Sequence, residues 1–155
     1  MLRIVWRIGA LLLLPAIVLG FLSLLSRRPT ALGAMDGRLK ECPNTLACVS
    51  SQTSRVSRRV EAIRFAGSAE EALEELRRVV DGLPNTRVVT RGDGYLRAEC
   101  VSRVFRFVDD VEFLVDRERH VIHCRSASRI GYYDFGVNRR RVEEIRRRFA
   151  AHGAS

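Results

Sequence analysis

Lysine is almost absent from this 155-residue chain, although its formal net charge is +9. Lys40 is the only lysine, so arginine carries the positive charge. Guanidinium forks match carboxylates and phosphates well, which is compatible with an anionic partner. Aromatic residues amount to only 7%, and the sequence has no basic groove interleaved with aromatics and no known nucleic-acid motif. Several arginines also flank an apolar segment and bear on membrane topology, so we expect no nucleic acid binding.

Signatures of catalysis and of metal binding are also lacking. His120 and His123 lie three residues apart in an expected strand, where that spacing places them on opposite faces, so they do not share a metal. Asp109 and Asp110 are adjacent, so they also point to opposite faces and cannot act together on one substrate. The serines do not stand in a nucleophile-elbow motif. We therefore expect a protein that is not an enzyme and that carries no cofactor and no metal.

An uncharged segment near the N-terminus predicts a membrane anchor. Residues 8–25 contain no charge and follow a basic start with Arg3 and Arg7. As a helix, 18 residues would span about 27 Å, just enough to cross a bilayer. The run ends in Ser26-Arg27-Arg28-Pro29, a poor cleavage site, which favours an uncleaved signal-anchor over residues 1–28. We expect a single-pass inner-membrane protein, although arginines on both flanks give no orientation.

The four cysteines indicate the compartment. Cys42 and Cys48 stand in C-P-N-T-L-A-C and can form a disulfide or a metal pair, but no nearby histidine completes a ligand set. We prefer the disulfide, which requires an oxidising compartment and so favours a periplasmic domain. Cys100 and Cys124 lie in expected strands that a third strand separates. They would be about 9.6 Å apart, beyond disulfide reach, so we expect two buried free thiols.

The remaining pattern predicts an α+β fold. Ser68 and Glu71 form a capping-box signature before a helix that ends at Gly82. Gly92-Asp93-Gly94 is a hairpin signal between strands. We expect an antiparallel sheet of four to five strands packed with two helices, preceded by the transmembrane anchor helix. The expected strands cover 60–65, 87–90, 95–102, 105–115 and 120–126, the last helix covers 139–150, and the divisions are anchor 1–28, tether and cysteine loop 29–57, and domain 58–155.

The polar run after the last strand is the candidate site. Asp109 lies on the apolar face of its strand, where a carboxylate needs a partner, and we expect Arg125 and Arg129 to supply it. Asn138 is the expected N-cap of the last helix. The arginines at positions 139–141 oppose the helix dipole, which suggests an anion site. The candidate ligand-binding residues are Arg125, Ser126, Ser128, Arg129, Tyr132, Asp134, Asn138, Arg139 and Arg140.

A structural interpretation of the same residues stays open. The arginines would then neutralise Asp109, Asp110 and Glu112 and lock the loop onto the sheet, as internal ion-pair networks commonly do. The two interpretations lead to two functions. One is a membrane-anchored, non-enzymatic envelope module that recognises an anionic small molecule or lipid headgroup. The other is an interaction or structural module with an envelope protein partner, whose arginine–serine motif only locks the fold.

Three motifs together resemble one known family. They read C-P-N-T-L-A-C-V-S-S at 42–51, F-V-D-D-V-E-F at 107–113 and R-S-A-S-R-I-G-Y-Y-D-F-G-V-N-R-R-R-V-E at 125–143. They are similar to the bacterial and plastid family called domain of unknown function 1499, over about residues 39–149. The resemblance implies that Cys42, Cys48, the acidic strand and the arginine–serine loop are family hallmarks. The family's usual loop has a serine where Tyr133 stands, and the resemblance implies no activity or cofactor.

Overall fold

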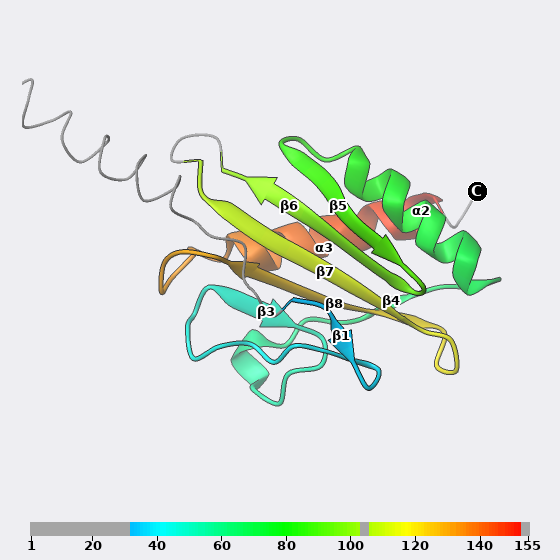
Figure 1. Ribbon diagram of the computed structural model, residues 1–155, viewed down its shortest axis with the longest axis horizontal. Coiled ribbons are helices and arrows are strands. Elements are labelled where there is room, and N and C mark those ends of the chain that lie inside the picture. The colour runs from blue at the N-terminus through cyan, green and yellow to red at the C-terminus, as the bar shows by residue number, and fades with distance from the viewer. Residues whose placement is uncertain (1–31, 103–105, 153–155) are drawn as a thin grey trace, which may run out of the picture.

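The computed structural model describes residues 32–102 and 106–152. Its centre is a six-stranded sheet with the order β3-β8-β7-β6-β5, in which β4 also pairs with β8 (Figure 1). The α+β class is confirmed, while the sheet has more than the four to five strands that we expected. Its strands are β3 (Cys48–Ser50), β4 (Ile63–Arg64), β5 (Thr86–Gly92), β6 (Tyr95–Val101), β7 (Val108–Asp116) and β8 (Val121–Ser128).

The strands β5 to β8 form a meander in which neighbours in sequence pair antiparallel. The hairpin between β5 and β6 closes through Asp93 and Gly94, and Gly94 has a φ of +67°, which glycine adopts without strain. Cys100 on β6 and Cys124 on β8 are free, buried and separated by β7, as predicted. Burial raises the pKa of the Cys124 thiol to about 12.

Two helices cover one face of the sheet, α2 (Ala69–Asp81) and α3 (Val137–His152) (Figure 1). The capping box before α2 is confirmed, since Ser68 and Glu71 exchange side-chain and backbone hydrogen bonds. Leu76 of α2 and Ile145 of α3 join the strand residue Phe113 in one buried apolar cluster. Burial of this face holds the helices against the sheet.

The opposite face, here called the far face, is covered by residues of the stretch that we expected to be tether and cysteine loop. A short hairpin of β1 (Ala34–Met35) and β2 (Arg38–Leu39) precedes β3, and a 3₁₀ helix, η1 (Val56–Arg58), follows it. Leu39 is buried, and β3 pairs with β8 at the edge of the sheet. Strands of two or three residues are too short to show an alternating pattern, which is why the sequence did not predict them.

The expected anchor over 1–28 lies outside the described residues. Within the part of the chain that the structure describes, no helix is long and apolar enough to cross a membrane.

Candidate functional site

The strand β8 divides the arginine–serine motif between the two faces of the sheet. Ser126 pairs with Val111 and Ser128 with Asp109, and both serines lie on the helix-covered face. Arg125 pairs with Glu112 and points to the far face. Successive strand residues point in opposite directions, so the candidate residues cannot form one continuous surface. The motif therefore makes two separate networks.

Glu112 is the centre of the first network, on the far face. It is fully buried and accepts hydrogen bonds from Arg125 at 2.7 Å, from the Tyr95 hydroxyl at 2.8 Å and from the Gly33 N–H at 2.8 Å. Burial and the neighbouring Glu112 charge raise the pKa of Tyr95, which stays protonated and donates. Arg125, which belongs to the candidate ligand-binding set, is thus committed to an internal carboxylate.

Arg129 forms the second half of the far-face network. It donates to Asp110 at 2.7 and 2.8 Å and to Glu99 at 2.6 Å. Arg97 adds a 3.2 Å contact to Asp110. Hydrogen bonding to Asp110 raises the pKa of Arg129 despite the opposing effect of burial. Arg129 is therefore also committed to the protein's own carboxylates.

Asp109 has a different partner from the one that we expected. Arg125 and Arg129 lie on the far face, whereas Asp109 faces α3 and accepts a 2.7 Å hydrogen bond from Arg141. The prediction failed because it overlooked that odd-numbered residues of β8 point away from the odd-numbered residues of β7. The pairing register decides this relation, since Asp109 lies opposite Ser128.

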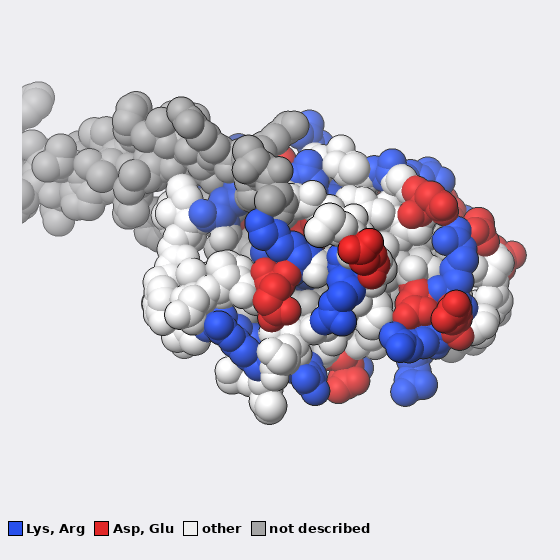
Figure 2. Space-filling model, turned by 60° about the horizontal axis from the view of Figure 1, so that its bottom comes forward, with Lys and Arg blue, Asp and Glu red and all other residues white. Residues whose placement is uncertain are grey.

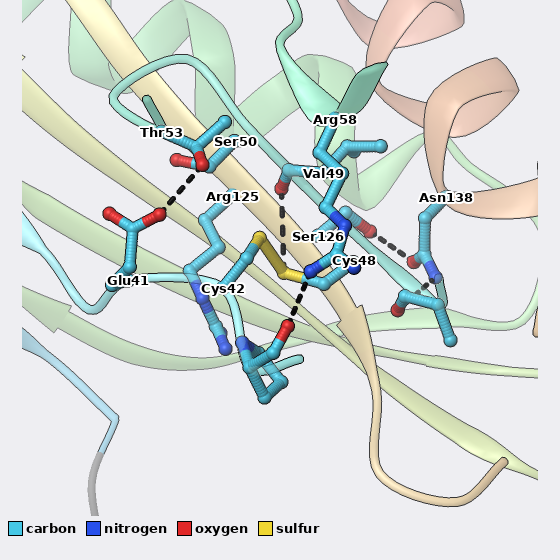
Figure 3. Close-up of a disulfide and its surroundings, with 12 residues drawn as sticks. Glu41, Cys42, Cys48, Val49, Ser50, Thr53, Arg58, Arg125, Ser126 and Asn138 are labelled. Atoms are coloured by element: carbon cyan, nitrogen blue, oxygen red, sulfur yellow. Dashed lines mark hydrogen bonds between the residues drawn. A yellow bond between two sulfur atoms is a disulfide. The ribbon is translucent and has the colours of Figure 1, made fainter. Parts of the chain in front are cut away.

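Asn138 joins β8, α3 and the cysteine loop in the helix-face network (Figure 3). It is fully buried, accepts from the Ser126 hydroxyl at 2.5 Å, and donates to the Ala47 carbonyl at 3.0 Å and to Ser128 at 3.2 Å. Asn138 is not the N-cap that we expected, because α3 already begins at Val137. A fully satisfied buried amide of this kind fixes the relative position of three segments.

Asp134 satisfies the start of α3 instead. Its carboxylate accepts hydrogen bonds from the N–H groups of Gly136 at 3.0 Å and Asn138 at 2.7 Å. A negative charge at this end also complements the helix dipole. The backbone groups that would have formed an anion site are thus already occupied in part by the protein itself.

The disulfide between Cys42 and Cys48 is confirmed, with an S–S distance of 2.06 Å and Cα atoms 5.8 Å apart (Figure 3). Both cysteines are buried and pack with Ala127 on the far face. Arg58 reaches this loop and donates to the Pro43 carbonyl at 2.6 Å. The bridge therefore holds in place the carbonyl groups that Arg58 and Asn138 contact.

The loop between β8 and α3 carries exposed aromatic side chains. Tyr132, Tyr133 and Phe135 are exposed, and the rings of Tyr133 and Phe135 meet edge to face at 4.9 Å. The Leu46 N–H donates to the Tyr132 carbonyl at 2.7 Å, which ties this loop to the cysteine loop. Figure 2 shows mixed charges over the middle of the molecule and an uncharged surface at the left end, where Figure 1 places this loop.

A cleft of about 190 Å³ opens between the cysteine loop, η1 and the start of α3. Its lining includes Leu46, Arg58, Tyr133, Arg139 and the acidic Asp134. Arg139 donates to the carbonyls of Ser57 at 2.9 Å and of Arg59 at 2.8 Å. Both arginines of the cleft are therefore bonded to neutral backbone oxygens, which leaves their positive charge uncompensated by direct contact.

Three more arginines near this cleft share that property. Arg55 donates to the Asn44 side-chain oxygen at 2.9 Å, and Arg140 donates to the Phe135 carbonyl at 2.9 Å. Arg59 contacts the Thr53 carbonyl. Among the described residues no carboxylate forms an ion pair with any of these, whereas the arginines of both internal networks do. The members of this arginine cluster are Arg55, Arg58, Arg59, Arg139 and Arg140.

A comparison with protein families finds one family that matches most of the chain. The family described as "Protein of unknown function (DUF1499)" matches residues 38–149. The chain belongs to this family. The DUF1499 match runs from β2 into α3, so it includes the disulfide, the cleft and both networks except the Gly33 N–H that bonds to Glu112. No curated protein and no solved structure matches the chain.

Sequence reasoning missed one polar array in this DUF1499 domain. Ser51 and His123 approach to 3.2 Å through Oγ and Nδ1, and His123 Nε2 lies 3.7 Å from Asp116. Desolvation lowers the pKa of His123, with Asp116 opposing, so the ring stays neutral. The Ser51 oxygen also accepts the Cys124 N–H at 2.9 Å. The array thus ties Ser51, which follows β3, to the neighbouring strand β8.

A larger cleft of about 560 Å³ lies between α2 and α3. Its acidic side chains already have partners: Glu71 caps α2, Glu74 pairs with Arg77 and Glu75 pairs with Arg78. The cleft thus offers no uncompensated charge of the kind found beside Arg139.

Proposed function

We propose that this chain is a membrane-anchored, non-enzymatic binding module of the cell envelope that recognises an anionic group in the cleft beside Arg58 and Arg139. The observation that carries this proposal is that both arginines line the cleft while donating only to backbone carbonyls. Guanidinium groups donate strong, charge-assisted hydrogen bonds to phosphate and carboxylate groups. The Asp134 carboxylate at the same cleft accepts from backbone N–H groups and forms no ion pair with either arginine among the described residues, so a bound anion would give the two arginines a direct counter-charge.

The proposed location rests on two further features. The uncharged segment over 8–25 has the length of a single membrane span, which supports an inner-membrane anchor. The disulfide between Cys42 and Cys48 supports an oxidising compartment, hence a periplasmic domain.

The nine candidate ligand-binding residues divide into two groups in this proposal. The residues of the buried networks lock the fold: Arg125, Ser126, Ser128, Arg129 and Asn138. Tyr132, Arg139 and Arg140 at the cleft and its rim remain for binding, whereas Asp134, which accepts the N–H groups at the start of α3, belongs with the first group. Because the first group already bonds within the protein, its role in the motif would be structural. This supports the second candidate function, an interaction module that contacts an envelope protein through the exposed loop.

Titration of the full chain in detergent with inorganic phosphate tests the anion proposal by calorimetry. One hydrogen bond to a charged group contributes about 1.5–3 kcal/mol, so Arg139→Gln should weaken phosphate binding about tenfold or more. Arg147→Gln is the matched control, because this exposed arginine already pairs with Glu144 on the same helix. Equal phosphate binding by the two variants, or no binding by the wild type, would favour the interaction module.

A further inference from the structure

Five of the seven large apolar side chains that are exposed among the described residues lie in the loop before α3, at the start of α3 and on the cysteine loop, beside the arginine cluster; the other two are Met35 on β1 and Val56 on η1. Phe135 is 77% exposed, Tyr132 62% and Val137 40%, and Leu46 on the adjoining cysteine loop is 46% exposed. Isolated exposed hydrophobic residues are normal, but a group of them beside uncompensated positive charge marks a docking surface. We call Leu46, Tyr132, Tyr133, Phe135 and Val137 the apolar rim of the cleft.

The loop of the apolar rim is held in one shape. Phe135 has a φ of +54°, a left-handed conformation that is unfavourable for a bulky residue. Three contacts stabilise this conformation: the hydrogen bonds that the Asp134 carboxylate accepts, the packing of the Tyr133 ring on that of Phe135, and the hydrogen bond from the Leu46 N–H to the Tyr132 carbonyl. The backbone thus accepts strain while the Phe135 ring remains outside the core. Strain of this kind is typical of binding segments that are ordered before the partner arrives.

We propose that the apolar rim and the arginine cluster dock on the surface of a bilayer that contains anionic phospholipid. This inference rests on the proposed function and names its ligand: the phosphate of a lipid headgroup enters the cleft between Arg58 and Arg139. The rings of Tyr132 and Phe135 lie in the interfacial region, where amphipathic aromatic side chains are stabilised. Each arginine near an anionic surface strengthens the attraction about fivefold.

The distance along the chain favours a membrane as the occupant. Only six residues separate the end of the apolar segment at Leu25 from Leu32, so these two residues are at most about 25 Å apart. Gly33 bonds to Glu112, which lies opposite Arg125, three residues before the end of β8. The base of the loop is therefore roughly 10 Å farther along the sheet. A lipid surface is within reach of this face at all times, whereas a separate partner must diffuse to it.

A tryptophan placed in the loop reports its position. Trp6 is the only tryptophan, so Trp6→Phe gives a silent background into which Phe135→Trp is introduced. The full chain is reconstituted in nanodiscs of phosphatidylcholine alone or with phosphatidylglycerol, each with brominated acyl chains as quencher. We expect quenching of the tryptophan at 135 to be at least about threefold stronger in the anionic discs, and Arg139→Gln with Arg140→Gln to remove the difference.

Glu118→Trp is the matched control in the same background. Glu118 is exposed in the turn at the other end of β8, roughly 25 Å from the loop, and its tryptophan should stay unquenched in both discs. Quenching at position 135 that ignores lipid charge or the arginine substitutions overturns the headgroup proposal. An unquenched tryptophan at 135 in anionic discs overturns membrane docking. If inorganic phosphate still binds in an Arg139-dependent manner, the proposed anion site stands without the membrane.

Discussion

Arg125 and Glu112 lie opposite each other on β8 and β7 and form a 2.7 Å ion pair from which water is excluded. The side chain of Arg125 is 6% exposed and that of Glu112 is 0% exposed. Tyr95 and the Gly33 N–H complete the hydrogen bonds of the carboxylate. Through the Gly33 N–H, the Glu112 carboxylate also holds the segment before β1 against the sheet.

Replacing Glu112 with glutamine should destabilise the domain by about 3–5 kcal/mol, since Arg125 would remain as an uncompensated buried charge. Urea denaturation followed by circular dichroism measures the loss. Asp93→Asn is the control, because Asp93 pairs with Arg117 on the surface, where its side chain is 89% exposed. Its midpoint should match the wild type. A Glu112→Gln midpoint equal to that of the control would show that the pair contributes little.

Asn138→Ala should lower the free energy of unfolding by about 1–3 kcal/mol. The Ala47 carbonyl would keep only the hydrogen bond from the Ser128 N–H, and Ser126 would lose its acceptor in a site that excludes water. Val137→Ala is the neighbouring control, because the Val137 side chain is partly exposed and forms none of these hydrogen bonds. Hydrogen exchange gives a second readout: amides of the cysteine loop should exchange faster in Asn138→Ala only. Unchanged exchange would mean that Asn138 does not hold that loop.

The sequence predicted those parts of the fold that depend on local pattern. The capping box at Ser68 and the hairpin turn at Gly94 are written in a few adjacent residues, and both are confirmed. The disulfide of the cysteine loop was also predicted from spacing and composition. Such features do not depend on which strands pair, so they can be predicted from the local sequence pattern.

The partners of the charged residues depend on long-range register and were harder to predict. Asp109 was assigned to Arg125 and Arg129, yet it pairs with Arg141. The alternation of side chains along β8 predicts that Arg125 and Ser126 point to opposite faces of the sheet. The arginine that faces Asp109, however, comes from α3, and no local pattern specifies how α3 packs on the sheet. The contact of Ser51 with His123 likewise joins segments 72 residues apart.

Removing the disulfide should cost about 2 kcal/mol in the chain-entropy description, because Cys42 and Cys48 close only a short loop. Thermal unfolding of the double variant Cys42→Ala with Cys48→Ala measures this cost. The wild-type chain with a reductant should melt at the same temperature as the variant. Without reductant, maleimide should label neither cysteine of the native wild type, and the thiols of Cys100 and Cys124 should react only after unfolding. Labelling of the native, unreduced chain at Cys42 would contradict the bridge.

His123 should make the stability of the domain fall as the pH decreases below about 6.5. Burial lowers its pKa in the folded state, against the raising effect of Asp116 and together with Arg119 and Arg38. The unfolded chain therefore binds a proton near its ordinary value of 6.5 while the folded chain does not, and unfolding is favoured as protons are added. One proton limits the slope to about 1.4 kcal/mol per pH unit.

Urea denaturation at intervals between pH 7.5 and pH 5.5 measures this slope, and His123→Gln should flatten it. The folded pKa of Asp116 is also lowered, by the Arg119 backbone N–H first, but its contribution is lost only below its ordinary value of 3.8. The two groups thus act in separate pH ranges, and the upper range belongs to His123. A wild-type slope that survives in His123→Gln would mean that another group takes up the proton on unfolding, and that the pKa of His123 does not differ between the folded and the unfolded chain.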